Sequence, residues 1–249
     1  MSDITTQKKN TPKVLHNRGS SKVKEDIARS IVCGDWPEDG LLPTEIELAD
    51  SMGVARTSVR EALSHLKGKG LLESRQKTGT RVLPRKQWNM LDEDVLRWAW
   101  SGNNRFEMAM HLMQIRRIIE PAACALVAEL ATDKAIATIE RAYRAMDAAG
   151  MDAQAYAAPD LEFHKAILRA TENPFLVTFG ATIEAALKMS FELSMKQPEA
   201  PRKGLAMHRA VLEKIWEGKP EEAKLKMEYL LEVTESNIKR AIVRAQQTS

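Results

Sequence analysis

Cysteine is scarce in this 249-residue chain, and the cysteines that occur are far apart. Cys33 and Cys124 are the only two, which argues against a disulfide framework or a cysteine metal site. The sequence also lacks any apolar run approaching the roughly 18 residues of a membrane span. No signal-peptide pattern opens it. We therefore expect a cytoplasmic protein with no membrane partner.

A large excess of charge of one sign is also absent. The net charge is +3, with 29% charged and 44% hydrophobic residues, values typical of a soluble globular protein. The charge is nevertheless uneven, because residues 1–86 contain 16 Lys/Arg against 11 Asp/Glu and the remainder contains 21 against 23. The basic segment is therefore the candidate for binding nucleic acid, whose phosphates need neutralising.

Residues 42–72 predict two short helices joined by a tight turn. Thr44, with Glu47 three residues later, predicts a capping box at the start of the first helix. Gly53 can adopt the positive φ that ends a helix in a tight turn. The second helix begins near Ala55 and groups polar side chains at its N-terminal end, where a helix-turn-helix meets the major groove. These side chains are Arg56, Thr57, Ser58 and Arg60.

A basic hairpin follows this motif directly. Residues 71–74 and 81–83 have strand patterns, and the turn between them contains Arg75, Lys77 and Gly79. The commoner interpretation of the two helices alone is an ordinary helical hairpin with a solvated basic face. The added hairpin favours a winged helix-turn-helix, in which the wing lies against DNA.

The rest of the chain is almost entirely helical in pattern. We expect a mobile basic arm over 1–19, the winged helix-turn-helix over 20–83, a linker over 84–91 and a helical domain over 92–249. The predicted helices of the last domain span 92–102, 105–130, 133–149, 152–171, 174–196, 203–217 and 220–245. The fold class is therefore mainly α, with an antiparallel helical bundle after the winged helix.

Three residues of the helical half have the chemistry of metal ligands. Asp160 and His164 are four apart, so they project from one face of a helix, and His208 lies in a later amphipathic helix. A carboxylate and two imidazoles can hold zinc, nickel or manganese. A structural histidine is the commoner role for this spacing, so the residues alone leave both roles open.

The stretch from Leu42 to Leu72, with its wing, resembles the DNA-binding domain of GntR-family transcriptional regulators. The resemblance implies that Arg56 and Arg60 are the two arginines of the recognition helix and that Gly79-Thr80 is the wing tip. The family often has arginine where this chain has Ile46, and glycine where it has Lys77. Both departures imply an operator different from the best-known ones. We expect these residues at the DNA interface: Thr44, Glu45, Arg56, Thr57, Ser58, Arg60, Lys77, Gly79 and Thr80.

The helical half is similar to the FCD ligand-binding domain of the FadR subfamily. The similar segments are IRRIIEPAACALVAELAT, DLEFHKAIL, ENPFL and MHRAVL. The resemblance implies that Asp160, His164 and His208 are three metal ligands. It places the fourth, a histidine in the family, at Leu230, which cannot ligate. Water or the effector would then fill the open positions.

The same resemblance implies that Arg116 binds the effector together with Asp160, His164 and His208. A guanidinium suits a carboxylate, since the two form a bidentate pair. Residues 84–98 resemble the corresponding segment of repressors of galactonate catabolism. A sugar acid, either an aldonate or a 2-keto-3-deoxy-aldonate, is therefore the leading effector class.

Together these features predict a homodimeric repressor that a sugar acid releases from operator DNA. Two alternatives remain open: a regulator that senses another small carboxylate (a fatty acyl, lactate or amino-acid ligand), and a metal-dependent enzyme. An enzyme is disfavoured because no nucleophile, Gly-rich phosphate loop or acid–base pair stands out. The sequence alone does not distinguish a repressor from an activator.

Overall fold

The computed structural model describes residues 20–247 except 76–77, 101, 103–104 and 195–199. The chain divides between Asn89 and Met90 into two compact units, described separately below. This boundary falls inside the expected linker, residues 84–91. The expected arm, residues 1–19, lies outside the described residues.

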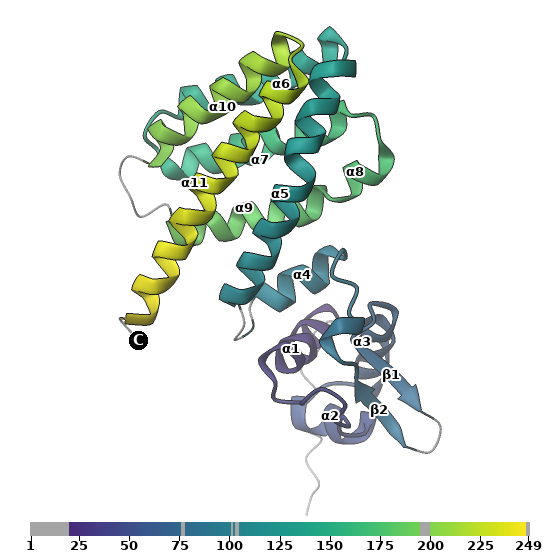
Figure 1. The fold of residues 1–249 in the computed structure, drawn as a ribbon. Coiled ribbons are helices and arrows are strands. Elements are labelled where there is room, and N and C mark those ends of the chain that lie inside the picture. Colours follow the sequence, from purple (N-terminus) through teal and green to yellow (C-terminus); the bar gives the residue numbers. More distant parts are fainter. Residues whose placement is uncertain (1–19, 76–77, 101, 103–104, 195–199, 248–249) are drawn as a thin grey trace, which may run out of the picture. The chain divides into compact units, whose positions relative to one another are not determined.

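The N-terminal unit is a three-helix motif with a two-stranded wing (Figure 1). Apolar side chains of the first and third helices form its core, among them Ile27, Leu63 and Leu66. The elements are α1 (Ser20–Cys33), α2 (Glu45–Met52), α3 (Arg56–Gly68), β1 (Leu72–Arg75), β2 (Gly79–Val82) and the 3-10 turn η1 (Arg85–Gln87).

Both ends of α2 have the expected local chemistry. Thr44 accepts a hydrogen bond from the backbone N–H of Glu47 at 3.3 Å, and the Glu47 carboxylate accepts one from the N–H of Thr44 at 2.8 Å. This capping box satisfies backbone donors that the first turn of a helix leaves unpaired. At the other end, Gly53 has a φ of 65°. The predicted start and end of α2 are both confirmed.

The wing is an antiparallel pair whose register runs from Leu72 opposite Val82 to Arg75 opposite Gly79. Leu41 adds an isolated bridge to Arg81 on the outer side of β2. The predicted hairpin after the helix-turn-helix is therefore confirmed.

The first part of the expected linker packs against the N-terminal unit. The indole N–H of Trp88 donates to the carbonyl of Leu83 at 2.8 Å, and Arg85 donates to the carbonyl of Val32 at 2.8 Å. These bonds fix the chain as far as Trp88, so residues 84–88 belong to the winged-helix unit.

The C-terminal unit is all-helical within its described residues. Its helices are α4 (Glu93–Trp100), α5 (Arg105–Leu130), α6 (Asp133–Ala149), α7 (Ala153–Ala170), α8 (Pro174–Thr178), α9 (Gly180–Ser194), α10 (Ala200–Trp216) and α11 (Pro220–Gln247). None of them is long and apolar enough to cross a membrane, within the part of the chain that the structure describes.

One predicted boundary is wrong. The sequence suggested a single helix over 174–196, but Phe179 separates α8 from α9. Its N–H bonds to the carbonyl of Leu176, three residues back, in a tightened turn. Its own carbonyl then accepts the first bond of α9, from Ile183. Gly180, a poor helix former, stands at this junction.

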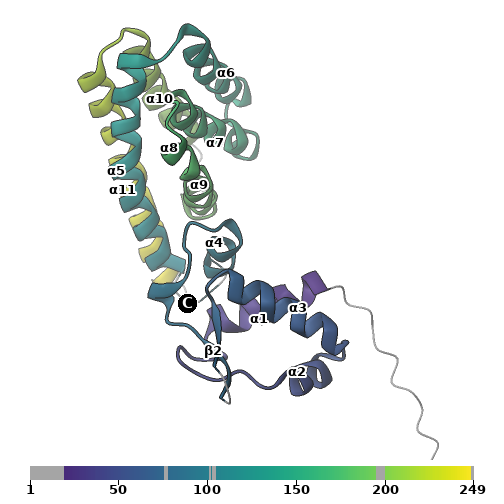
Figure 2. The same ribbon diagram turned by 90° about the vertical axis from the view of Figure 1, so that its right-hand side faces the viewer.

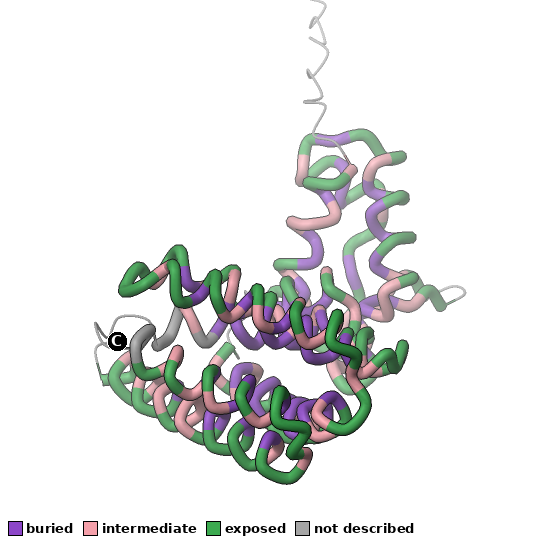
Figure 3. Tube along the Cα trace, turned by 90° about the horizontal axis from the view of Figure 1, so that it is seen from above, coloured by how far each residue is buried: buried purple, intermediate pink, exposed green. Residues whose placement is uncertain are grey.

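Helices α5 and α11 lie side by side in both ribbon views (Figures 1 and 2). Arg117 on α5 and Glu235 on α11 form an ion pair of 2.8 Å between them. Helices α6 and α7 form a second close pair, and α10 packs against α11 and α6. The buried residues line the inner faces of these helices (Figure 3). The functional side chains described next are on those inner faces.

Candidate functional site

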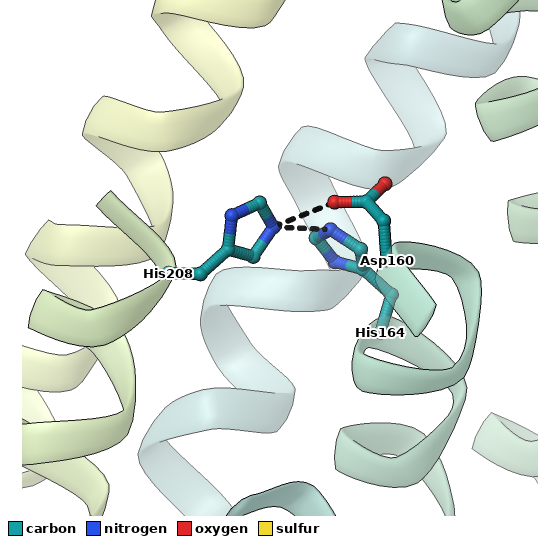
Figure 4. Close-up of side chains that lie close together, drawn as sticks. All are labelled: Asp160, His164 and His208. Carbon is teal, nitrogen blue, oxygen red and sulfur yellow. Dashed lines mark hydrogen bonds and ion pairs between the residues drawn. The ribbon is translucent and has the colours of Figure 1, made fainter. Parts of the chain in front are cut away.

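Helices α7 and α10 bring the three predicted ligand residues together. Asp160 and His164 are one turn apart on α7, and His208 faces them from α10 (Figure 4). His208 Nε2 lies 3.0 Å from Asp160 Oδ1 and 3.2 Å from His164 Nε2. One ligand atom from each residue lies within 4.8 Å of the others, and all three residues are buried. The sequence therefore correctly predicted that these residues form a group.

Helix α5 adds a buried ion pair to this cluster. Arg116 donates through Nε to Glu120 Oε1 at 2.5 Å, and Glu120 Oε2 lies 2.6 Å from His164 Nδ1. Arg116 and Glu120 are each only 1% exposed. The Arg116 Nη2 atom is 3.3 Å from His164 Nε2. Arg116 was expected at the site, and the structure places it there.

Glu120 is a site residue that the sequence analysis did not identify as one. Its spacing of four from Arg116 places the two on one helix face, which was the available signal. Tyr156 was missed too, although it is one turn before Asp160. Its hydroxyl oxygen is 3.4 Å from His208 Nδ1. Burial raises the pKa of Tyr156, so its phenol stays protonated.

The partners of the two histidines indicate which ring nitrogens carry protons. His164 Nδ1 faces the Glu120 carboxylate, and His208 Nδ1 is 2.8 Å from the carbonyl oxygen of Gly204. Both partners are acceptors, so each Nδ1 is assigned as the donor. The Nε2 atom of His208 then faces both Asp160 Oδ1 and His164 Nε2. Either a proton on His208 Nε2 or a cation between the three atoms balances this arrangement.

A divalent metal fits this donor set. For metal–nitrogen bonds of about 2.0–2.1 Å, neighbouring ligand atoms lie about 3.3 Å apart in tetrahedral and about 3.0 Å apart in octahedral geometry. The observed separations are 3.0 and 3.2 Å. The Glu120 carboxylate and the Gly204 carbonyl would hold the two imidazoles in ligating orientation, as outer partners do in metal sites. A proton on His208 Nε2 would satisfy its contact with Asp160 as well, so metal content has to be measured.

Leu230, at the family's fourth ligand position, is buried in α11. Its side chain has no ligand atom. The predicted positions therefore offer at most three ligands, and water or a bound anion would fill the other positions of a metal held there.

The electrostatics keep the carboxylates of the cluster ionised. Burial raises the pKa of Glu120, but the charge of Arg116 and the hydrogen bond from His164 outweigh it and bring that pKa to about 2. Burial likewise opposes ionisation of Asp160, and His208 more than offsets it, so the pKa of Asp160 is lowered. Burial and the charge of Arg116 lower the pKa of His164. Ionised carboxylates and a neutral imidazole are the states that bind metal.

One atom of the cluster is left without a partner. Arg116 Nη1 is a buried donor with no hydrogen-bond partner among the described residues. Leaving a buried charged donor unpaired costs about 1–3 kcal/mol or more. An anion placed beside Arg116 would remove that cost.

The predicted DNA-contacting residues of α3 lie on its exposed face. Arg56, Thr57 and Arg60 are exposed, and Ser58 is half-buried. Arg60 forms an ion pair with Glu45, the first residue of α2. These positions form the outer surface of the first turns of α2 and α3.

The wing contributes further predicted positions. Gly79 is exposed with a φ of 98°, which favours glycine. The carbonyl of Thr80 accepts a hydrogen bond from the N–H of Leu42 at 2.8 Å, which ties the wing to the chain before α2. Lys77 lies outside the described residues.

The fold and the sequence place the chain in a known class. Residues 20–82 match bacterial regulatory proteins of the gntR family, and residues 111–233 match the FCD domain. The chain belongs to the GntR family of DNA-binding transcriptional regulators that have an FCD domain. It is therefore a regulator and not an enzyme.

Individual relatives support the same class. The galactonate operon transcriptional repressor of Escherichia coli K12 is 32% identical over 76% of this chain and 83% of its own. The Glc operon transcriptional activator of the same strain is 27% identical over 78% of this chain and 80% of its own.

Solved structures share the fold. A Streptococcus agalactiae GntR protein aligns with a TM-score of 0.51 at 23% identity, covering 87% of this chain and 99% of that one. Lar, which controls the expression of the Listeria monocytogenes agr system, aligns with a TM-score of 0.63 at 18% identity, covering 94% of this chain and 99% of that one.

Proposed function

We propose that this regulator is a homodimeric repressor of the cytoplasm that leaves its operator when a sugar acid binds. The observation that carries the effector class is the unpartnered, buried Nη1 of Arg116, beside the group of Asp160, His164 and His208. A carboxylate would pair with the guanidinium. The relative named for the galactonate operon supports an aldonate or a 2-keto-3-deoxy-aldonate.

A divalent metal, zinc, nickel or manganese, would be held by Asp160, His164 and His208. When bound, it would supply a positive centre with open positions for an effector carboxylate or hydroxyl. The protein's part is to fix the two imidazoles through Glu120 and the Gly204 carbonyl.

The proposed DNA surface consists of the first turns of α2 and α3 together with the wing. Arg56 and Arg60 would read base edges, since arginine pairs with guanine O6 and N7. Thr57, Ser58, Lys77 and Thr80 would contact phosphates or bases, and Thr44, Glu45 and Gly79 complete the surface. A two-fold dimer would place two such surfaces on a pseudopalindromic operator.

The proposed response is a shift of population. An effector at Arg116 would favour a dimer geometry whose two winged helices no longer match the operator spacing. An effector of equal affinity for both geometries would change nothing, so the sugar acid has to bind the released geometry more tightly.

Operator binding with and without sugar acids tests the proposal. We expect the purified protein to bind DNA upstream of its own gene tightly, and galactonate or a related aldonate to weaken that binding. Pyruvate, lacking the polyhydroxyl chain, serves as a matched carboxylate control. Tight binding that no sugar acid weakens would reject sugar acids as the effector class, while the protein would still be a DNA-binding regulator.

A second effector class has one specific observation in its favour. The buried Nη1 donor of Arg116 has no partner among the described residues and can pair with any carboxylate, whatever the rest of the ligand. Panels of fatty acyl, lactate and amino-acid ligands in the same assay separate this alternative from the first.

A further inference from the structure

Arg60 is held by a carboxylate before any DNA is bound. Its Nε and Nη2 atoms donate to the same oxygen of Glu45, Oε2, at 3.1 and 3.0 Å. The side chain of Arg60 is 65% exposed. An exposed ion pair contributes little to folding, so the main consequence of this contact is the orientation of the guanidinium.

The backbone that carries this carboxylate is held at a capped helix start. Glu45 is the first residue of α2, where the helix dipole favours a negative charge. The adjacent Thr44 and Glu47 form the capping box that fixes the backbone at this point. Glu45 therefore presents its oxygen to α3 from a rigid helix start.

The contact leaves one particular edge of the guanidinium available. A guanidinium has five N–H donors in a planar fork. Glu45 occupies the side edge formed by Nε and Nη2. The end edge, with one N–H from Nη1 and one from Nη2, is not used by Glu45. Two parallel donors of this kind match the O6 and N7 acceptors of guanine.

Arg56 offers a contrast on the same helix. It is exposed at the first residue of α3 and makes no ion pair with any residue that the structure describes. Ordering a free, rotamer-rich side chain on binding costs conformational entropy. Arg60 has part of this ordering already in place, and Arg56 does not.

We propose that Glu45 is the positioning residue for base recognition, because it holds the side edge of Arg60 and directs the end edge at guanine. The inference rests on the proposed reading role of Arg60. It assigns Glu45 a function through Arg60 instead of a direct contact with DNA, which its negative charge would oppose.

Selection from a random duplex library measures this directly. The wild-type protein, Arg60→Ala, Glu45→Ala, Glu45→Gln and the double variant Glu45→Ala/Arg60→Ala are each used to select DNA. We expect Arg60→Ala to lose guanine preference at one base pair of each half-site. Glu45→Ala should lose about tenfold in discrimination at that same base pair.

Two features of the result separate positioning from a structural role. Glu45→Gln keeps an acceptor oxygen for Arg60, so it should retain much of the preference. In the Arg60→Ala background, removing Glu45 should lower discrimination no further, because a positioning residue acts only through its partner. Glu61→Ala, which removes an exposed carboxylate next to Arg60 on α3, is the charge control and should keep the preference.

The outcomes are distinguishable. If the wild-type protein selects no sequence, both the proposed function and this inference fail. If Arg60→Ala loses the guanine but Glu45→Ala keeps it, the inference alone is overturned. The capping box remains in Glu45→Ala, so we expect it to fold. Should it unfold, Glu45→Ser, which also removes the carboxylate, takes its place, and the same outcomes apply.

Discussion

At the scale of single residues, two ion pairs of the same spacing have very different environments. Arg116 and Glu120 are four apart on α5 and almost completely buried. Glu140 and Arg144 are four apart on α6, with side chains 33% and 75% exposed. Removing one partner of a buried ion pair strongly destabilises the folded protein, whereas water screens an exposed pair, so its loss costs little. Burial, and not spacing, therefore decides what each pair contributes.

The matched substitutions make this difference measurable. Glu120→Ala leaves Arg116 buried and unpaired, so we expect the free energy of unfolding to fall by about 3–5 kcal/mol. Glu140→Ala should lower it by less than about 1 kcal/mol. Urea denaturation with a chelator present measures both without a contribution from metal. Equal losses would show that the buried pair has no special role.

Substitution of His164 tests whether the proposed sensing role can be separated from DNA binding. His164→Ala removes one of three candidate ligands, so we expect bound metal and the sugar-acid response to fall while operator affinity stays near wild type. His111→Ala, an exposed histidine on α5, is the control and should change none of these. Metal analysis of the purified proteins and operator titrations provide the readouts. A loss of operator affinity in His164→Ala would assign the residue a structural role.

At the scale of elements, the join between α2 and α3 sets the geometry of the DNA surface. Gly53 ends α2 with a φ of 65°, and α3 begins three residues later at Arg56. A side chain at Gly53 would meet no atom within 4 Å, so a substitution there acts through backbone strain alone. A Cβ at Gly68 would also meet no atom within 4 Å, but the φ of Gly68 lies outside the left-handed region.

These two glycines should therefore respond in opposite directions to alanine. Gly53→Ala forces a residue with a Cβ into the left-handed region, and we expect a loss of about 1–2 kcal/mol. Gly68→Ala replaces a helical glycine and should stabilise by about 0.4–1 kcal/mol. Thermal and urea unfolding of the two variants give the comparison. Stabilisation of both would mean that α2 ends differently in solution.

At the scale of the whole molecule, the chain contains a DNA-binding unit and an FCD domain, and the proposed function couples them. Coupling between two binding sites is a free energy and is therefore reciprocal. If a sugar acid lowers operator affinity by a given factor, operator DNA has to lower sugar-acid affinity by the same factor.

We expect that factor to be about 5–150, corresponding to about 1–3 kcal/mol of coupling. Calorimetric titration of the effector into free protein and into the protein–operator complex measures how far DNA changes the affinity for the effector. Operator titrations with and without saturating effector measure how far the effector changes the affinity for DNA. Unequal factors would point to a further state, such as a change of oligomer, that the two-state description omits.

Much of the fold could be predicted from local pattern. The capping box at Thr44, the glycine at position 53 and the hairpin after α3 depend on near neighbours in the chain, so the sequence determined them. The spacing of Asp160 and His164 fixed their common face for the same reason. The break at Phe179 was missed although Gly180 follows it, because a single glycine inside an apolar helical pattern does not by itself end a helix.

The composition of the site was decided by tertiary packing. Asp160, His164 and His208 were expected together, but the sequence offered no reason for Glu120 to meet His164 or for Glu45 to hold Arg60. Each of those contacts joins residues on different helices, 44 and 15 positions apart. Local periodicity fixes which face of a helix a side chain occupies. Only the packing of one helix on another decides which carboxylate meets which basic side chain. The same packing leaves Arg116 Nη1 buried, with no hydrogen-bond partner among the described residues.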